Sequence, residues 1–340
     1  MNKSLKISGL ENKTNNNNII EVKGLKKYFP IAKGFMQKDI EYLKAVDNIS
    51  FTIEKGKMFG LVGESGCGKS TTGRLLVKSY EPTAGEILFK GNNVVDLPKK
   101  DISAFRQSVQ MIFQDPYESL NPRMTIFDIV SEPLKVHKIG TVNEREEKVA
   151  EILELVGLVP ASSFIFRYPH ELSGGQRQRV AIARAIVIEP DFIVADEPTS
   201  MLDVSIRTQV MELMMKLQEE LEVSYLYITH DLAVARYLCD RIAVMYLGNI
   251  VEMGEIESVT QNPIHPYTKA LISAVPIPDP TFNRESIEIK GGISKPINPL
   301  PRCRFYDRCP EADETCKNQA APELTELGED HFVACYHAKK

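Results

Sequence analysis

"GESGCGKST", residues 63–71, follows directly on the apolar run "FGLV" of residues 59–62. The stretch fits the pattern G-x-x-x-x-G-K-[ST], in which glycines let a loop wrap so that its backbone N–H groups point at phosphates. Lys69 would then supply a positive charge to the β- and γ-phosphates, and the Ser70 hydroxyl can coordinate Mg²⁺. A Gly-rich turn before a helix is the alternative interpretation. We expect nucleotide contacts from Gly63, Glu64, Ser65, Gly66, Cys67, Gly68, Lys69, Ser70 and Thr71.

An acidic pair ends another short apolar run, "FIVADEP", residues 192–198. Ligands of open α/β sheets bind at the ends of strands, so this pair is expected at the same crevice as the glycine-rich loop. Asp196 would hold Mg²⁺ through its water shell, and Glu197 would polarise the attacking water. Adjacent carboxylates are costly together unless a cation compensates them, and Mg²⁺ does so. The alternative is a solvated acidic turn before Pro198.

A third motif is "LSGGQRQRVAIARAI", residues 172–186. Ser173 is a plausible N-cap for a long helix, and two glycines follow it. The motif predicts a second anion-binding helix N-terminus, far in sequence from the first. Because one nucleotide does not need two phosphate cradles, two subunits placed head to tail could each lend this segment to the other's nucleotide. A Gly-broken helix start is the alternative. The expected contacts are Ser173, Gly174, Gly175 and Gln176.

Composition is that of an ordinary globular protein, with 340 residues, 43% hydrophobic and 26% charged. The net charge of -5 does not favour a general nucleic-acid-binding surface. Residues 1–18, which are rich in asparagine, contain no apolar run typical of a signal peptide and predict a flexible tail. We find no apolar stretch of about 18 residues, so a spanning helix is not expected. In a reducing cytoplasm, clustered cysteines are more often metal ligands than disulfides.

The pattern of apolar residues changes along the chain. Residues 19–113 are strand-rich, residues 115–172 are helical, and strands alternate with helices between 190 and 241. A Pro-rich stretch, residues 261–301, forbids long regular elements and predicts a strap leading to the C-terminal cysteines. The clearest helical stripe is Val149, Ile152, Leu153 and Val156, with Gly157 placed to end that helix.

Together, "GESGCGKS", "LSGGQ" and "FIVADEP" resemble the ATP-binding subunit of ATP-binding cassette (ABC) transporters, and the resemblance covers the chain from Ile19 onward. It implies further site residues. Gln114 in "IFQDP" resembles the glutamine that contacts Mg²⁺ and water, and His230 in "YITHD" resembles the histidine that reaches the γ-phosphate. Asp203 ends "SMLD", which is similar to the family's D-loop although Met201 replaces the usual alanine. Phe29 resembles the aromatic residue that stacks on adenine, with Tyr28 as the alternative.

The resemblance implies an α/β fold with a P-loop (RecA-like) parallel sheet core, an N-terminal antiparallel β subdomain and an inserted helical subdomain at about 115–172. The ATPase domain would span 19–258, and a Pro-rich strap with a four-cysteine domain would span 259–340. ATP would join two such subunits, with Ser173 and Gly175 of one facing the γ-phosphate held by Lys69 of the other. Catalysis would fall to Glu197, His230 and Gln114, and Mg²⁺ to Ser70, Gln114 and Asp196.

Three features resemble the oligopeptide, dipeptide and nickel importer branch of the family. They are "QDPYESLNPRMT" from Gln114, the insertion "FPIAKGFMQKDIEYLKAVDNISF" at 29–51, and "NPIHPYTKALISAVP" before the cysteine-rich tail. The first two are most similar to the F-type, or second, ATPase of a peptide importer. The resemblance implies a heterodimer with a similar ATPase, two permease subunits and an extracytoplasmic binding protein, at the cytoplasmic face of a bacterial membrane and without nucleic acid. A non-transport ABC ATPase of translation or DNA repair, or an importer of nickel or other cargo, is the alternative.

Four of the six cysteines gather near the C-terminus, spaced C-x5-C-x6-C-x18-C. This spacing differs from common zinc knuckles and from the ferredoxin pattern, although four thiolates suit a tetrahedral site or a cubane cluster. The resemblance implies a [4Fe-4S] cluster; Zn²⁺ or metal-free thiols are the alternatives. His331 and His337 flank the last cysteine but are not expected as ligands, and Cys67 and Cys239 are taken as ordinary. The expected cluster ligands are Cys303, Cys309, Cys316 and Cys335.

Overall fold

The computed structural model describes residues 17–31, 40–275, 289, 291–292 and 294–338. Most of the predicted tail, 1–18, therefore lies outside the described residues, as do parts of the insertion at 29–51 and of the Pro-rich strap. Within the described residues, no helix combines the length and the apolar character needed to cross a bilayer.

An eight-stranded sheet forms the centre of the molecule, in the order β11-β12-β10-β9-β3-β8-β7-β6. Strands β9, β3, β8, β7 and β6 pair in parallel, and β10, β12 and β11 continue the sheet in antiparallel fashion. The strands span β3 Met58–Val62, β6 Val109–Ile112, β7 Phe192–Asp196, β8 Ser224–Thr229, β9 Arg241–Tyr246, β10 Asn249–Glu255, β11 Thr325–Gly328 and β12 His331–Val333. The parallel strands β3, β7 and β8 are buried along their whole length, as expected for a sheet covered on both faces.

A second, antiparallel sheet has the order β2-β1-β4-β5 and is built almost entirely from the N-terminal quarter of the chain. Its strands span β1 Asn18–Ile31, β2 Glu41–Glu54, β4 Ala84–Phe89 and β5 Asn92–Asn93. Apolar side chains from its inner face pack against one side of the central sheet, for example Phe51 on Phe59 with ring centroids 5.2 Å apart. The predicted fold class, with a parallel core and an N-terminal antiparallel part, is confirmed.

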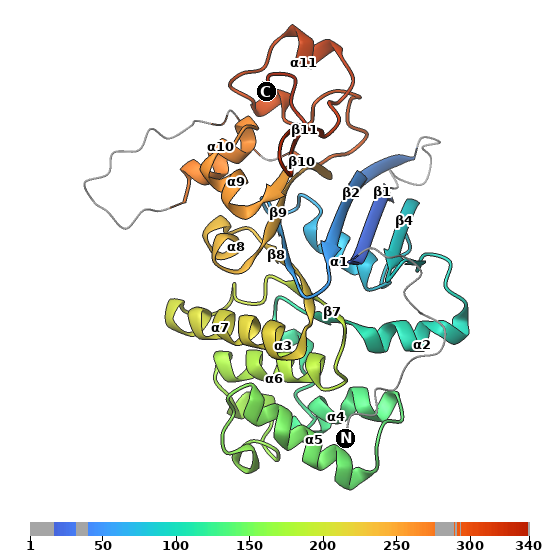
Figure 1. The fold of residues 1–340 in the computed structure, drawn as a ribbon, viewed down its shortest axis with the longest axis vertical. Helices are drawn as coiled ribbons and strands as arrows, with labels where there is room; N and C mark the ends of the chain where they lie inside the picture. Colours follow the sequence, from blue (N-terminus) through green and yellow to red (C-terminus); the bar gives the residue numbers. More distant parts are fainter. Residues whose placement is uncertain (1–16, 32–39, 276–288, 290, 293, 339–340) are drawn as a thin grey trace, which may run out of the picture.

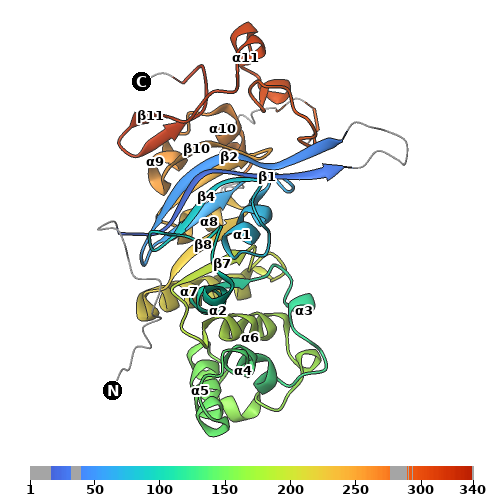
Figure 2. The same ribbon diagram turned by 90° about the vertical axis from the view of Figure 1, so that its right-hand side faces the viewer.

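Helices cover the central sheet, and a group of them lies beyond it at one end of the molecule. The views show α4 and α5 at one end of the molecule and α11 at the other, with the central sheet between them (Figure 1, Figure 2). The α-helices span α1 Lys69–Leu76, α2 Lys99–Ser108, α3 Pro116–Ser119, α4 Ile126–Val136, α5 Val142–Leu155, α6 Gly174–Ile186, α7 Val204–Leu221, α8 Leu232–Leu238, α9 Ile256–Gln261, α10 Pro266–Ser273 and α11 Glu314–Asn318. Short 3₁₀ turns span η1 Ala161–Ser163, η2 Pro169–Glu171 and η3 Tyr306–Arg308.

Helix α5 shows how local sequence determines an element here. Thr141 caps its start in a capping box with Glu144, which satisfies two backbone N–H groups. The predicted stripe packs inward, since Val149, Ile152 and Leu153 are buried. Gly157 follows with φ 80°, a left-handed conformation that favours glycine at a helix end. The apolar stripe joins the larger of two cores, which lies on the helical side of the central sheet.

Candidate nucleotide-binding site

The glycine-rich loop connects the end of β3 to the start of α1, so it lies at the carboxyl edge of the parallel strands. Gly68 is the N-cap of α1, with φ 113°. A Cβ atom at Gly68 would overlap the carbonyl oxygen of Ala45, and one at Gly63 would overlap that of Met245. Only glycine fits at these two positions. They are the two fixed glycines of the motif, and the loop can therefore wrap tightly against β2 and β9.

Lys69 lies inside the wrapped loop. Its side chain is only 4% exposed, and its Nζ donates hydrogen bonds to the carbonyl oxygens of Gly63 at 2.7 Å and Glu64 at 3.0 Å. The ammonium group is therefore held inside the loop, next to the start of α1, where the N-cap Gly68 provides no side-chain hydrogen bond. Such an arrangement of fixed dipoles and one full charge suits a phosphate chain.

Ser70 and Asp196 meet across the two strand ends. The Ser70 hydroxyl donates to Oδ1 of Asp196 at 2.9 Å, although 126 residues separate them. Burial raises the pKa of Asp196, and the hydrogen bond from Ser70 partly opposes that rise. A hydroxyl and a desolvated carboxylate side by side are the oxygen ligands that Mg²⁺ prefers, and a bound cation would reverse the raised pKa. These residues therefore fit the metal that the motifs predict.

Glu197 is held by two side chains from the neighbouring strand ends. Its Oε2 lies 3.0 Å from Nδ1 of His230, which follows β8, and accepts a hydrogen bond of 3.4 Å from Nε2 of Gln114, which follows β6. Its backbone has φ 45°, uncommon for a residue other than glycine and a conformation that recurs at functional sites. The three predicted catalytic side chains thus meet beside Asp196, at one edge of the sheet.

The "LSGGQ" segment forms its own cap. Ser173 Oγ accepts from the backbone N–H of Gln176 at 3.3 Å, and the Gln176 side chain accepts from the N–H of Ser173 at 3.0 Å. Gly175 packs closely on α7, because a Cβ there would lie 2.5 Å from Cγ2 of Ile206. Asp203 is used in the same way at the start of α7, where its Oδ1 accepts from the N–H of Ile206 at 3.0 Å. Both segments are helix starts, and in the described part of the chain their capping bonds stay local.

Comparison with known proteins decides the family. The model of the ABC transporter family matches residues 46–200, and that of the oligopeptide/dipeptide transporter C-terminal region matches 251–316. The chain is 50% identical, over 95% of its length and 98% of the relative's, to the oligopeptide transport ATP-binding protein AppF of Bacillus subtilis. It is 47% identical, over 95% and 97%, to the dipeptide transport ATP-binding protein DppF of Haemophilus influenzae. The chain belongs to the ABC transporter family of ATP-binding proteins.

Solved structures of ABC proteins share the fold. The ATP-binding cassette MJ0796, in a dimeric post-hydrolysis state bound to ADP and Pi, has a TM-score of 0.61 and 31% identity, covering 70% of this chain and 98% of its own. CbiO1 from Clostridium perfringens has a TM-score of 0.62 and 28% identity, covering 73% and 92%. The resemblance stated from the motifs is therefore confirmed, including its oligopeptide/dipeptide branch.

In this ABC protein the two candidate adenine-stacking residues lie in different surroundings. Phe29 packs edge-on against Tyr80, with ring centroids 5.7 Å apart, and Nζ of Lys27 lies 5.1 Å from its centroid. The Tyr28 hydroxyl instead donates to Asp47. Neighbouring residues of a strand point to opposite faces, so the two rings cannot serve one base together. Phe29 stays the predicted stacking residue, with Tyr28 as the alternative.

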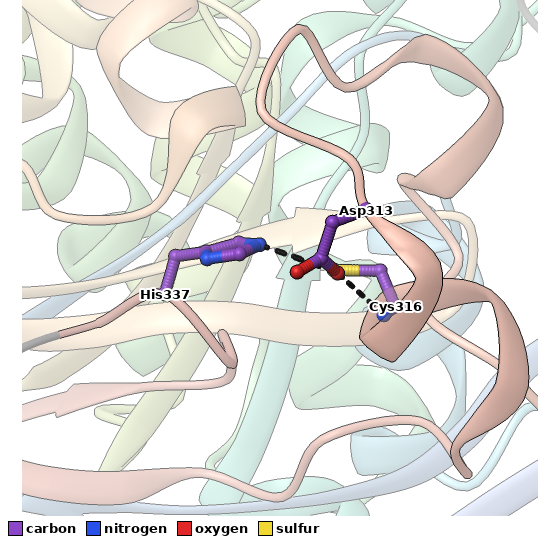
Figure 3. A group of neighbouring side chains, drawn as sticks. All are labelled: Asp313, Cys316 and His337. Atoms are coloured by element: carbon purple, nitrogen blue, oxygen red, sulfur yellow. Dashed lines mark hydrogen bonds and ion pairs between the residues drawn. The ribbon is translucent and has the colours of Figure 1, made fainter.

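The C-terminal cysteines lie together in the extension, but not as a tight set. All four are free thiols, and burial, with the neighbouring thiols, raises the pKa of Cys303 and of Cys309 to about 11 each. Within the described residues, the group whose ligand atoms lie within 4.8 Å of one another is Asp313, Cys316 and His337 (Figure 3). The Cys316 sulfur is 3.5 Å from Nε2 of His337, and that nitrogen is 3.6 Å from Oδ1 of Asp313.

Sequence reasoning missed Asp313 as a neighbour of the thiols, and it placed His337 beside Cys335 without expecting it among the ligands. His331 was not expected as a ligand either, and its two ring nitrogens lie 2.8 Å from Glu252 and 3.0 Å from Ser258. The matched C-terminal family region ends at residue 316, so it includes three of the four cysteines and leaves out Cys335. The position of His337, two residues after Cys335, does not by itself show that its ring lies beside Cys316.

Proposed function

We propose that this chain is the ATP-hydrolysing subunit that powers peptide uptake through an ABC importer. One observation carries the proposal: Lys69 and Ser70 lie beside Asp196, and the Glu197 carboxylate contacts the side chains that follow β6 and β8. These side chains are Gln114 and His230. Relatives with 47–50% identity bear the names of oligopeptide and dipeptide transport proteins, which supports peptide as the cargo.

In the proposed reaction, the loop and Lys69 bind the β- and γ-phosphates, and Ser70, Asp196 and Gln114 would hold Mg²⁺. Bound Mg²⁺ would offset the negative charge of the phosphates. Glu197 orients the attacking water and takes up its proton, while His230 and Gln114 hold the Glu197 carboxylate at a fixed point. Because the strand ends fix all of these groups before ATP arrives, little reorganisation is needed when charge develops on the phosphate.

We further propose that the second half of each site comes from a partner ATPase. Ser173 and Gln176 cap one another, which leaves the remaining N–H groups at the start of α6 available to the γ-phosphate of a partner's ATP. The dimeric state of the cassette MJ0796 supports such a pairing. We propose a heterodimer with a similar ATPase, because this chain is most similar to the F-type ATPase of a peptide importer, whose partner is a D-type ATPase.

The assembled importer would contain two permease subunits and an extracytoplasmic binding protein, with this chain at the cytoplasmic face of a bacterial membrane. The ATPase part would span about 19–258, and the strap with the four-cysteine part would span 259–340. Uptake of labelled oligopeptide by a deletion strain tests the proposal. The unaltered chain and Lys216→Ala, which removes an exposed lysine that pairs with Glu220, should restore uptake, and Lys69→Ala should not. Association with ribosomes or DNA, with normal peptide uptake in the deletion strain, would instead favour a non-transport ATPase.

For the extension we propose a [4Fe-4S] cluster held by Cys303, Cys309, Cys316 and Cys335. A cubane needs its four sulfur ligands farther apart than a single ion does, which agrees with thiols that are neighbours but do not converge within 4.8 Å. Anaerobic purification should give a coloured protein with about four iron and four sulfide per chain. Cys303→Ser should bleach it and Cys239→Ser, at a buried thiol elsewhere, should not. A colourless preparation with one Zn²⁺ would favour the zinc alternative.

A further inference from the structure

The 3₁₀ turn η3 of the C-terminal extension lies directly against the glycine-rich loop. The Arg308 guanidinium makes a two-pronged ion pair with Glu64, the second residue of that loop: Nη1 to Oε2 is 2.7 Å and Nη2 to Oε1 is 3.2 Å. Arg308 is only 8% exposed, and its Nη1 also lies 3.5 Å from the hydroxyl of Tyr246. A planar, bidentate pair of this kind is directional, so it fixes position as well as charge.

The two residues that precede η3 anchor it to the rest of the protein. Phe305, which is buried, packs against Tyr246 and Tyr267 with ring centroids 5.1 and 5.5 Å away. Arg304 donates to the carbonyl oxygen of Leu247 at 3.1 Å and pairs with Asp47. These contacts join the turn to the central sheet and to β2, the two surfaces on which the loop itself rests. The guanidinium is therefore presented to the loop by a rigid support.

Glu64 is consequently held at three points. Its carbonyl oxygen accepts from Lys69 Nζ at 3.0 Å, its N–H donates to the hydroxyl of Tyr267 at 2.9 Å, and its carboxylate pairs with Arg308. Two of these three partners come from the last quarter of the chain, beyond the nucleotide motifs. A carboxylate in a loop that receives a polyanion would repel it, and the repulsion is strong where solvent is excluded. The ion pair with Arg308 offsets the negative charge of the Glu64 carboxylate, which would otherwise be unpaired beside the phosphates.

We propose that Arg308 is a positioning residue for the P-loop, through which the cysteine-rich extension sets the affinity of this subunit for its own nucleotide. The inference rests on the proposed function, because it assumes that the loop binds ATP. It adds that the extension takes part in nucleotide binding although it supplies none of the motif residues. The pair Arg308–Glu64 acts on the loop and on the electrostatic potential at the phosphates, and Arg308 does not itself touch the reacting atoms.

Equilibrium titration of the full-length chain with the Mg²⁺ complex of a non-hydrolysable ATP analogue tests the proposal. Arg308→Gln should weaken binding about tenfold, because the Glu64 carboxylate is then unpaired beside the phosphates. Arg302→Gln is the matched control, since Arg302 pairs with Asp307 at 2.9 Å and lies over the Tyr306 ring rather than on Glu64, and should bind as the unaltered chain does. The double variant Glu64→Gln/Arg308→Gln should recover affinity to within about threefold, because the opposing charge is gone.

A purely structural role for Arg308 predicts a different result. The melting temperature of Arg308→Gln without nucleotide would then fall, but its affinity for the analogue would equal that of Arg302→Gln. The double variant would bind no more tightly than Arg308→Gln. Either of these two affinity results would overturn the proposal. If Arg308→Gln does not fold, Glu64→Gln alone remains decisive. Arg308 then faces the phosphates without its carboxylate, and binding should tighten about threefold; a tenfold loss overturns the proposal. Failure of the unaltered chain to bind the analogue would refute the proposed function itself.

Discussion

Adding one methyl group at two neighbouring glycines of the loop should have very different effects. Gly66 has φ 79° and open space around its added Cβ, with nothing within 4 Å. Gly68 has φ 113°, and its Cβ would overlap the carbonyl oxygen of Ala45 in β2 and lie 2.7 Å from Cε of Met245 in β9. Both glycines pay the cost of left-handed backbone on substitution by alanine, but only Gly68→Ala must also displace backbone.

The size of the difference follows from these contacts. A left-handed conformation costs alanine about 1–2 kcal/mol, and this term applies at both positions. Overpacking adds about 1–3 kcal/mol at Gly68 alone, because the Met245 side chain can shift but the Ala45 carbonyl in a paired strand cannot. The loop can relieve the overlap by moving away from β2, which misdirects the N–H groups at the start of α1. A cost of about 1–3 kcal/mol taken up in this way corresponds to roughly 5- to 150-fold weaker nucleotide binding than in Gly66→Ala.

The assay is binding of the Mg²⁺ complex of a non-hydrolysable ATP analogue, with a melting temperature measured without nucleotide for each variant. We expect both variants to fold and Gly68→Ala to bind at least fivefold more weakly than Gly66→Ala. Equal affinities would refute the reasoning, since the overlap with Ala45 and Met245 arises at Gly68 and not at Gly66. Weak binding by Gly66→Ala alone would refute it as well.

Three further predictions concern catalysis, dimer contacts and pH. Glu197→Gln keeps the side-chain shape but loses the base, so phosphate release should slow about 10²- to 10⁴-fold, and normal turnover would exclude Glu197 from that role. Ser173→Ala and Thr141→Ala each remove a capping box, at about 1 kcal/mol of unfolding free energy, but only the former should lower ATP-driven dimerisation; equal effects would contradict the assignment. Burial lowers the pKa of His265 to about 4, so the unfolded chain binds a proton there below pH 6.5 that the folded chain does not. Unfolding free energy should fall by up to about 3 kcal/mol as pH drops from about 6.5 to about 4, and His265→Asn, which can still cap α10, should flatten the fall in a pH series of melting curves.

Short-range chemistry made most of the nucleotide site predictable. The loop closes over nine consecutive residues, 63–71, and its two fixed glycines, Gly63 and Gly68, are required because a Cβ atom at either would overlap a backbone carbonyl oxygen. The run "FIVAD" predicted a strand buried on both faces, and every one of its residues is buried in the structure. A parallel sheet then brings its strand ends to one edge, which is why Asp196 and Ser70 could be expected together.

What escaped prediction depends on pairing across long separations. Glu64 meets Tyr267 and Arg308, which lie 203 and 244 residues further along the chain. No periodicity or spacing encodes such contacts, because they arise only when the extension packs on the central sheet. His337 also comes from elsewhere, 21 residues after Cys316, whereas Asp313 lies beside Cys316 for a local reason, as the N-cap of α11. The sequence around a charged residue does not indicate which distant residue will become its partner in the folded chain.

The two short strands near the C-terminus also change what the sheet offers to other chains. Without them, β10 would be an edge strand, and the backbone groups of Glu252, Met253 and Gly254 would stand unpaired where Val333, Phe332 and His331 now cover them. Open edges invite strand addition between molecules and hence aggregation. A chain truncated before residue 325 would therefore expose the edge of β10 with its backbone N–H and C=O groups unpaired. The truncated product should self-associate even if its nucleotide loop is intact.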